Sequence, residues 1–326
     1  MATSARPERR QSAVIYNPIK VAVPKLRTTV NAAAKAAGWA PPIYFATTEE
    51  DPGQRVTASA VRRGAEVVLV AGGDGTVRAV AEGLRDTGVA LAVLPSGTGN
   101  LLARNLSLPL GLDDAVAVAF TGKSHPIDLG IATVARANGD SEEHVFLVMA
   151  GLGIDAKMIS NTRSDLKKAV GWLAYIDGTI RSLPELGPIR LRYKLDSAAE
   201  RVTNVHSVIV GNCGVLPGGI LLIPDAKPDD GFLNVVALRP QGRLGWLRVW
   251  NKLTFENGVL RKTAVGRKII DLQRDVRDVI YLRGRDLQLR VDTPQEFQLD
   301  GDEFGEVISA RAWVDAGALS VRVPAP

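Results

Sequence analysis

A chain of 326 residues is too long for one ordinary hydrophobic core, so two domains are expected. Apolar residues make up 46% of the chain, which excludes a disordered protein; 40 Lys and Arg against 35 Asp and Glu give a net charge of +5, which suits an anionic partner without identifying one. The lone Cys213 excludes an internal disulfide and is typical of a reducing compartment.

The start of the chain indicates neither a signal nor a membrane anchor. Residues 1–12 are polar and arginine-bearing, with no apolar segment behind them, and are predicted to form a disordered tail. No stretch approaches the roughly 18 consecutive apolar residues that a membrane span needs. We therefore expect a soluble, cytoplasmic protein that can still associate peripherally with a membrane.

The first hundred residues alternate strands with helices. The first strand ends at Asn17-Pro18 and the second at Thr47. Strands that alternate with helices at short intervals predict a parallel sheet covered on both faces. The predicted elements are strand 13–16, helix 21–37, strand 43–46, helix 52–64, strand 67–70, a helix that runs to residue 84, strand 90–94 and helix 101–105.

The segment 67–84 joins a buried strand to a helix through a glycine loop. Glycines let the backbone approach a ligand, and the following helix directs unpaired N–H groups and its positive dipole end toward it, as a phosphate site requires. Asp74 would repel a bare phosphate, so it indicates a bound cation or a hydrogen bond to a nucleotide. The plain alternative is an Asp74-Gly75 hairpin turn, which needs a second strand where the sequence supplies a helix. The loop consists of Gly72, Gly73, Asp74, Gly75 and Thr76.

A second glycine loop follows the strand at 90–94. Alone it would be an ordinary turn, but two such loops at the carboxyl ends of strands in one sheet strengthen each other. Right-handed crossovers place Asn17, Thr47 and both loops along one rim, with Thr98 and Asn100 facing the same crevice. The second loop consists of Pro95, Ser96, Gly97, Thr98, Gly99 and Asn100.

The alternation of strands and helices weakens after Lys123, and we place the domain boundary near His125-Pro126. The nucleotide-binding domain is then 13–125 and a β-rich domain 126–326, whose final strand could return to the first domain. The predicted strands of the second domain are 145–150, 190–195, 207–210, 233–238, 287–291 and 319–323.

Two further segments of the second domain carry helical patterns. Residues 161–183 have an apolar stripe that is typical of a core helix. Residues 239–268 place Trp246 and Trp250 at helical spacing among eight Lys or Arg residues and one acid, which suits an anionic membrane surface. The alternative is a solvated basic helix whose tryptophans pack in the core. Nucleic acid is not expected as a partner, because the basic stretch has no matching fold motif.

Taken together, these motifs resemble the diacylglycerol kinase catalytic-domain family, the bacterial lipid kinases related to sphingosine kinases. A single motif would be shared with other kinases, but the ordered set is specific and covers nearly the whole chain. The matching segments are Asn17-Pro18, 72–76, 95–100 with Ala103-Arg104, 151–156, Gly171 with 174–176, Asn212 near Gly218-Gly219, 224–226 with Asp230-Gly231, and Asp300-Gly301-Asp302.

The resemblance implies an ATP-dependent lipid kinase with two lobes, in which the nucleotide lies in the cleft and the second lobe presents the acceptor hydroxyl. Asn17, Thr47, Gly73 to Thr76 and Thr98 would contact ATP. In similar proteins a structural magnesium ion is held by two backbone carbonyls and one carboxylate, which correspond here to Lys227, Asp230 and Phe232.

The resemblance also implies a proton acceptor at the carboxyl motif. The family glutamate falls on Asp302, which is one methylene shorter, so Glu303 or Asp300 could take the role. Many members carry an aspartate where this chain has Leu101, which leaves Asp74 and the 300–302 carboxylates to hold catalytic Mg²⁺. Without the resemblance, Asp300-Gly301-Asp302 would be interpreted as an ordinary acidic turn.

The favoured function is phosphorylation of a hydroxyl on a membrane lipid at an anionic surface, with diacylglycerol as the first acceptor and long-chain alcohols as others. One rival is an NAD kinase-like enzyme, which explains Gly72 to Thr76 but not the second loop. The other is a non-catalytic lipid-binding or regulatory protein that has kept the fold. The sequence leaves the acyl-chain specificity and a homodimer open.

Overall fold

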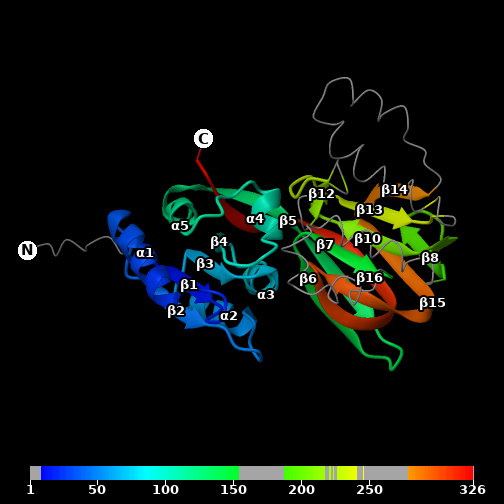
Figure 1. Ribbon diagram of the computed structural model, residues 1–326, viewed down its shortest axis with the longest axis horizontal. Helices are drawn as coiled ribbons and strands as arrows, with labels where there is room; N and C mark the ends of the chain where they lie inside the picture. The colour runs from blue at the N-terminus through cyan, green and yellow to red at the C-terminus, as the bar shows by residue number, and fades with distance from the viewer. Residues whose placement is uncertain are drawn as a thin grey trace, which may run out of the picture. The chain divides into compact units, whose positions relative to one another are not determined.

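The computed structural model describes residues 9–153, 187–216, 220, 221, 223, 226–240, 245 and 278–325. It divides into unit 1, Met1–Ile127 with Gly317–Pro326, and unit 2, Asp128–Ala316 (Figure 1). The division falls beside the His125-Pro126 boundary that the sequence suggests, and the end of the chain belongs to unit 1.

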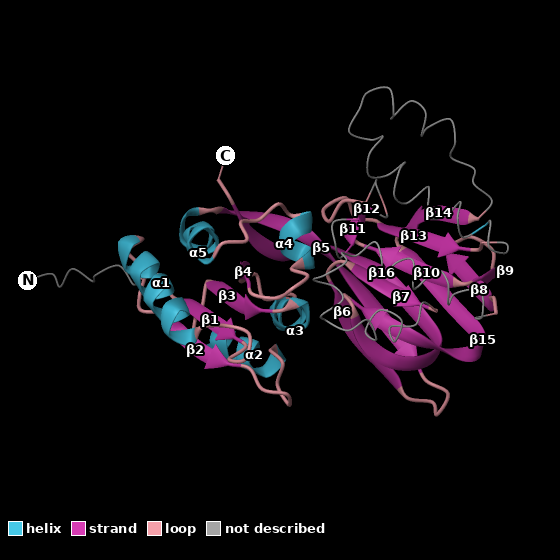
Figure 2. Cartoon of the chain, in the orientation of Figure 1, coloured by secondary structure: helices cyan, strands magenta, loops and turns pink. Residues whose placement is uncertain are grey.

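Unit 1 is a parallel sheet with helices on both faces (Figure 2). Its strands lie in the order β2-β1-β3-β4, and each pairs in parallel with its neighbour. Val321 of the last strand pairs in parallel with Leu91. The elements are β1 (Ser12–Tyr16), α1 (Val23–Ala36), β2 (Ile43–Ala46), α2 (Gln54–Arg62), β3 (Val67–Gly72), α3 (Asp74–Leu84), β4 (Ala90–Pro95), α4 (Leu101–Asn105) and α5 (Leu112–Thr121).

The core of unit 1 explains why β3 is continuously apolar. All six residues of β3 are buried, because successive side chains point to opposite faces and both faces are covered. On one face, Leu69 packs with Leu26 of α1 and Val116 of α5. Helices α2 and α3 pack against each other, and seven of the eleven residues of α3 are buried.

Unit 2 is rich in antiparallel strands. One path runs β14-β13-β10-β7-β15-β16; β8 and β9 extend from β15, and β5 and β6 extend from β16. The strands are β5 (Lys123–Ala135), β6 (Ser141–Phe146), β7 (Met149–Leu152), β8 (Ile189–Leu195), β9 (Arg201–Val205), β10 (Ser207–Gly211), β11 (Val215–Leu216), β12 (Ile220–Leu221), β13 (Leu233–Leu238), β14 (Val279–Gly284), β15 (Asp286–Leu299) and β16 (Asp302–Val323).

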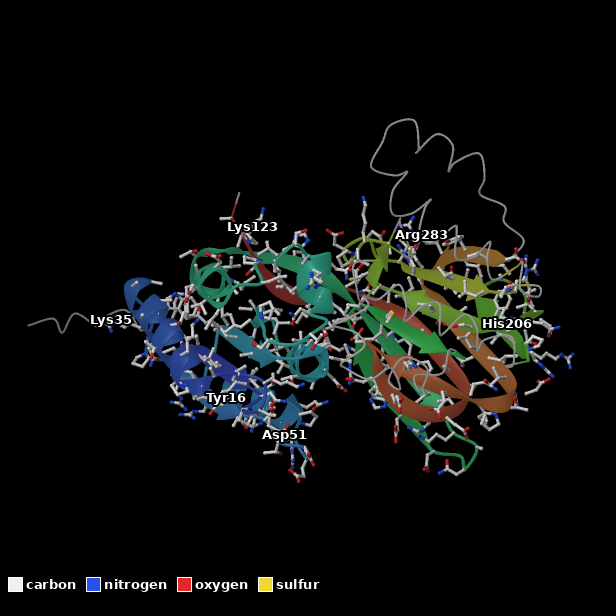
Figure 3. All side chains as sticks on the ribbon, viewed as in Figure 1. Tyr16, Lys35, Asp51, Lys123, His206 and Arg283 are labelled. Carbon is white, nitrogen blue, oxygen red and sulfur yellow. The ribbon has the colours of Figure 1, made fainter. Side chains whose placement is uncertain are left out.

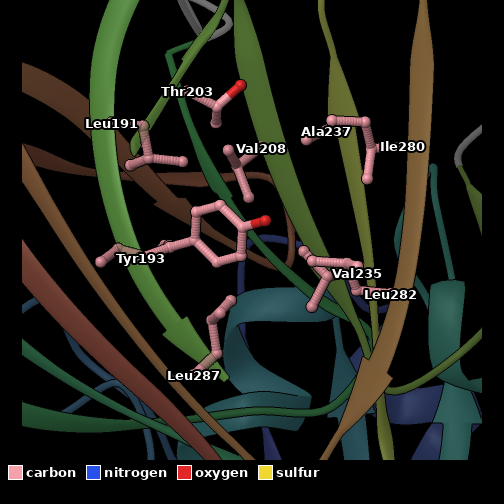
Figure 4. A pocket seen from close by; sticks show the side chains of 10 residues that line it. Leu191, Tyr193, Thr203, Val208, Val235, Ala237, Ile280, Leu282 and Leu287 are labelled. Atoms are coloured by element: carbon pink, nitrogen blue, oxygen red, sulfur yellow. The ribbon is translucent and has the colours of Figure 1, made fainter. Parts of the chain in front are cut away.

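The core of unit 2 contains a small apolar hollow, drawn in Figure 4. Side chains from β8, β9, β10, β13, β14 and β15 line it, and only a tyrosine and a threonine among them carry a polar group. The lining residues are Leu191, Tyr193, Thr203, Val208, Val235, Ala237, Ile280, Leu282, Leu287 and Leu289. The predicted fold class, a parallel α/β domain followed by a β-rich sandwich domain, is confirmed.

Several elements differ from the sequence prediction. Helix α5 and strands β5, β9 and β14 were not predicted, and the predicted strand 145–150 is interrupted at Leu147 and Val148. The interruption has a physical cause, because the N–H groups of these two residues bind the carboxylate of Asp300 instead of a neighbouring strand.

Some predictions lie outside the described residues. These are the helix at 161–183, the basic segment 239–268 apart from residues 239, 240 and 245, and residues 1–8 of the expected tail. Ser12, the last residue of that tail, is the first residue of β1. None of the helices among the described residues has both the length and the apolar character that a membrane span requires.

Candidate functional site

The four strands β1 to β4 end at one edge of the parallel sheet of unit 1. As expected, Asn17 follows β1, Thr47 follows β2, and the two glycine loops follow β3 and β4. The strand order reverses direction between β1 and β3, and ligands of open α/β sheets bind outside the carboxyl ends of the strands at such a switch point. This edge is therefore the candidate nucleotide site.

The first glycine loop passes directly from β3 into α3. Gly73 is the N-cap in extended conformation, and Asp74 and Gly75 are the first residues of the helix, so the hairpin alternative is wrong. A methyl group on Gly72 would lie 2.7 Å from Cβ of Thr76, which is itself buried. Only glycine therefore lets the helix start this close to the strand end, where its N–H groups point outward.

The second glycine loop is closed by its own asparagine. Asn100 Oδ1 accepts the N–H of Gly97 at 2.9 Å, and Asn100 Nδ2 donates to the carbonyl of Gly97 at 2.9 Å. Asn100 adopts a left-handed conformation with φ 48°, which asparagine tolerates better than most residues. Both ends of this amide hold the loop, whereas Thr98 is exposed.

The two loops are fastened to each other. Gly72 and Pro95 are paired residues of β3 and β4, and the N–H of Ser96 donates to the carbonyl of Gly72 at 3.2 Å. A methyl group on Gly97 would lie 2.8 Å from Cα of Gly73, so the two backbones touch. The loops form one surface rather than two separate turns.

Asp74 of the first loop reaches the second. Its Oδ1 accepts the N–H of Leu101 at 2.6 Å, and a methyl group on Gly99 would lie 2.6 Å from its Oδ2. The carboxylate thus caps the start of α4 and bridges the loops, a role that the sequence did not suggest. A carboxylate is also a hard oxygen ligand of the kind that Mg²⁺ binds, which is the role that the sequence predicts for Asp74.

Asn17 and Thr47 complete the edge. The N–H of Asn17 donates to the carbonyl of Ala71 at 2.9 Å, and Asn17 Oδ1 accepts the N–H of Ile19 at 3.0 Å. Thr47 is buried, and its N–H donates to the carbonyl of Tyr16 at 2.9 Å. Both residues shape the loops that leave β1 and β2 beside the glycine loops.

In unit 2 the acidic motif forms the hairpin turn between β15 and β16. Leu299 pairs with Asp302, and the two residues between them have positive φ, 52° at Asp300 and 93° at Gly301. This is the pattern of a two-residue type I′ turn. The ordinary-turn interpretation of this motif is therefore correct for its backbone.

The carboxylates of this hairpin differ in their surroundings. Asp300 is 5% exposed; its Oδ2 accepts the N–H of Leu147 at 2.9 Å, and its Oδ1 accepts those of Val148 at 2.8 Å and Met149 at 3.0 Å. Asp302 begins β16 and is exposed. Asp300 thus holds the hairpin to the β6–β7 connection, while Asp302 is open to solvent.

Two protein families match this chain, each over a different part of it. The diacylglycerol kinase catalytic domain matches residues 11–132, which include both glycine loops, and the YegS C-terminal NAD kinase beta sandwich-like domain matches residues 148–323. The chain belongs to the diacylglycerol kinase catalytic-domain family. It is therefore a member of a family of lipid kinases.

Individual relatives carry names that agree with this family assignment. A probable lipid kinase YegS-like of Pseudomonas aeruginosa is 33% identical over 285 residues, 86% of this chain and 83% of the relative. A diacylglycerol kinase of Mycobacterium tuberculosis is 30% identical over 198 residues, 60% of this chain and 62% of the relative. The crystal structure of a putative diacylglycerol kinase from Bacillus anthracis superposes with a TM-score of 0.73 at 19% identity, covering 99% of this chain and 98% of that one, which shows a shared fold.

Two of the three residues that the family resemblance assigns to a structural magnesium ion, Asp230 and Phe232, contact the side chain of Arg283. Asp230 Oδ1 accepts the N–H of Phe232 at 3.1 Å, and its Oδ2 pairs with Nη2 of Arg283 at 2.9 Å. The Arg283 guanidinium also stacks 4.0 Å from the centre of the Phe232 ring, at the surface of unit 2 (Figure 3). A divalent ion would compete with this half-exposed arginine for the Asp230 carboxylate, and the assignment of Lys227, Asp230 and Phe232 to a magnesium ion stays a prediction. Among the described residues, no three His, Cys, Asp or Glu side chains cluster to hold a metal.

Sequence reasoning missed the role of a buried polar network beside the hairpin. Asp128 is 3% exposed, and its Oδ2 accepts the N–H of Gly231 at 2.7 Å. Asn212 is fully buried and donates through Nδ2 to the carbonyls of Asp128 at 2.9 Å and Leu147 at 3.0 Å. One signal was available in the sequence, because a carboxylate between Ile127 and Leu129 in a buried run needs partners.

Cys213 adjoins the same network. Its Sγ lies 3.5 Å from the carbonyl of Leu147, and the residue is 2% exposed. Burial raises the pKa of the Cys213 thiol, and the negative charge of nearby Asp300 raises it further. The thiol is therefore neutral and unreactive in the folded protein.

Proposed function

We propose that this protein is an ATP-dependent lipid kinase that transfers the γ-phosphate of ATP to a hydroxyl of a membrane lipid, with diacylglycerol as the favoured acceptor and phosphatidic acid as the product. The observation that carries the proposal is the pair of interlocked glycine loops, which start at the paired residues Gly72 and Pro95 on the carboxyl edge of a parallel sheet. Membership of a lipid kinase family supports it.

The backbone of the two loops binds the phosphates of ATP. Gly73 and Gly97 carry no side chains, so an anion can approach the backbone of the loops closely, and the start of α3 directs its N–H groups and its positive dipole end toward that anion. Asp74 holds the loops in register. It is also the residue of this edge that would hold a magnesium ion, which supplies charge neutralisation on the transferred phosphate when bound.

Asp302 accepts the proton of the acceptor hydroxyl. The hydroxyl oxygen forms a bond to the γ-phosphorus, the bond to the β-phosphate oxygen breaks, ADP leaves, and the hydroxyl proton passes to the carboxylate. Asp300 positions the hairpin that carries Asp302 and has its own oxygens bound to three N–H groups. Glu303, also exposed, is the alternative acceptor.

A lipid acceptor at an anionic membrane surface is favoured over a dinucleotide by the relatives, which are named as a probable lipid kinase and a diacylglycerol kinase.

The test is incubation with ATP labelled in its γ-phosphate, Mg²⁺ and vesicles of diacylglycerol with anionic phospholipid, followed by mass spectrometry of the products. A sphingoid base and NAD are offered in parallel reactions. We expect label in a lipid that has gained one phosphate, and less label with the Asp302→Asn variant. Label in NAD would support the rival kinase, and no labelled product from any acceptor would support a non-catalytic protein.

A further inference from the structure

Arg104 is an exposed cation fastened to the second glycine loop. It lies on α4, and its Nε donates to the carbonyl of Gly99 at 2.9 Å. Its own N–H donates to the carbonyl of Asn100 at 3.0 Å. Within the part of the chain that the structure describes, Arg104 makes no ion pair with a carboxylate, although exposed arginines elsewhere in the molecule do so.

The hydrogen bond to Gly99 holds the Arg104 guanidinium in place and leaves most of its N–H donors available. A guanidinium has five N–H donors in a fixed plane, and the hydrogen bond to Gly99 uses one of them. The other four are arranged in the fork that matches two oxygens of a phosphate. An arginine held in place before binding also loses less side-chain entropy when the anion arrives.

The negative charge of Asp74 at this edge would repel a phosphate unless a cation lies nearby. The carboxylate of Asp74 lies against Gly99, so the surface that faces the phosphates carries a negative charge of its own. Arg104 is fastened to the carbonyl of that same glycine, and a positive charge there offsets the repulsion between Asp74 and a phosphate chain.

We infer that Arg104 is a phosphate-binding residue, whose guanidinium contacts the terminal phosphates of the bound nucleoside triphosphate and stabilises the charge that develops during transfer. The inference rests on the proposed function, because it takes the glycine loops to be the nucleotide site. The competing explanation is that the hydrogen bond to Gly99 only shapes the loop. The two explanations differ in which part of the nucleotide is affected when the arginine is lost.

The experiment is calorimetric titration of ATP, with AMP measured by competition, into the wild-type chain and the Arg104→Ala and Arg104→Lys variants. The control is Arg63→Ala, which removes another exposed arginine. Arg63 lies where α2 ends, before β3 begins, and hence at the opposite edge of the sheet. We expect Arg104→Ala to weaken ATP about ten- to a hundredfold, the loss of one charge-assisted bidentate contact, and to leave AMP within about twofold. The ATP affinity of Arg104→Lys should lie between those of the wild type and Arg104→Ala, and the ATP affinity of Arg63→Ala should equal that of the wild type.

The outcomes separate this inference from the proposed function. If the wild type binds neither ATP nor AMP, the proposed function fails and the inference falls with it. If the wild type binds ATP and the Arg104→Ala variant binds it equally well, only the inference is wrong. Equal losses of ATP and AMP would show that Arg104 merely shapes the loop. Should Arg104→Ala not fold by circular dichroism, the ATP-to-AMP comparison with Arg104→Lys decides in the same way.

Discussion

Replacing Asp300 by Ala tests whether its carboxylate is a structural anchor or a proton acceptor. The substitution removes the acceptor of three N–H groups, those of Leu147, Val148 and Met149. Leu147 and Val148 are 2% and 1% exposed, so water does not readily replace the lost oxygen, whereas Met149 is half-buried. A buried donor without an acceptor costs about 1–3 kcal/mol, and with partial rehydration at Met149 we expect a total of about 3–5 kcal/mol.

The assay uses the only cysteine as a reporter of this region. Cys213 contacts the carbonyl of Leu147 and is buried, so Ellman's reagent reaches the thiol only when this part of unit 2 opens. At about 1.4 kcal/mol per factor of ten, the thiol of the Asp300→Ala variant should react between about a hundredfold and a few thousandfold faster than that of the wild type.

The control is Asp302→Asn in the same hairpin. Asp302 is exposed, and surface substitutions change stability by about 0.5 kcal/mol or less. The Cys213 thiol of this variant should therefore react within about twofold of the wild-type rate, while phosphoryl transfer is reduced. If the Asp300→Ala variant keeps a native circular dichroism spectrum and a wild-type thiol rate, the anchoring role assigned to Asp300 is wrong.

Three further outcomes are expected. Asp74→Asn keeps an oxygen that can accept the N–H of Leu101, so it should retain ATP binding without metal but lose Mg²⁺-dependent turnover; unchanged turnover would remove Asp74 from the reaction. Arg283→Ala removes the cation that competes for the carboxylate of Asp230, so Mg²⁺ should raise the denaturation temperature of this variant more than that of the wild type, and an equal response of the two proteins would show that Arg283 does not compete with the ion. Because burial and a neighbouring negative charge raise its pKa, the thiol of native Cys213 should remain unmodified by iodoacetamide at pH 8 and react after denaturation, and rapid modification of the native protein would contradict the burial.

The architecture of unit 1 was predictable because its signals are local. The aliphatic run at β3 and the change to helical spacing after Thr76 are contained within one stretch of sequence, and they gave the strand, the loop and the helix. The predicted end of this strand, at Val70, was two residues short, since Ala71 and Gly72 continue the pairing with β4. Helix α5 was missed although Asp113 and Asp114 in its first turn are a recognisable start signal.

The contacts that define the candidate site were beyond local reasoning. Glycine spacing indicated two loops on one rim, but not that Asp74 reaches Leu101 across 27 positions or that Gly97 touches Gly73. Asp300 binds N–H groups about 150 positions earlier in the chain. Such pairs depend on how strands far apart in sequence are brought together, and a single sequence carries no direct signal of that pairing.

The ion pair between Asp230 and Arg283 is another contact between residues that are far apart in the sequence. The two residues are separated by 53 positions, so neither the sequence nor the family resemblance, which implies that Asp230 is a metal ligand, indicated this pair. Tertiary contact supplies the cationic partner. Sequence motifs therefore located the two glycine loops, whereas the partners of individual carboxylates could be identified only from the fold.

The central claim, that the fastened glycine loops bind a nucleoside triphosphate, is tested most directly by calorimetric titration of ATP into the wild type and a Gly97→Ala variant. A methyl group at Gly97 would lie 2.8 Å from Cα of Gly73 and must push the loops apart, whereas the control Gly111→Ala has no atom nearer than 3.7 Å. The account predicts that the wild type and Gly111→Ala bind ATP at one site and that Gly97→Ala binds it at least about tenfold more weakly. An unchanged affinity in a folded Gly97→Ala variant, or no binding by the wild type, would contradict it.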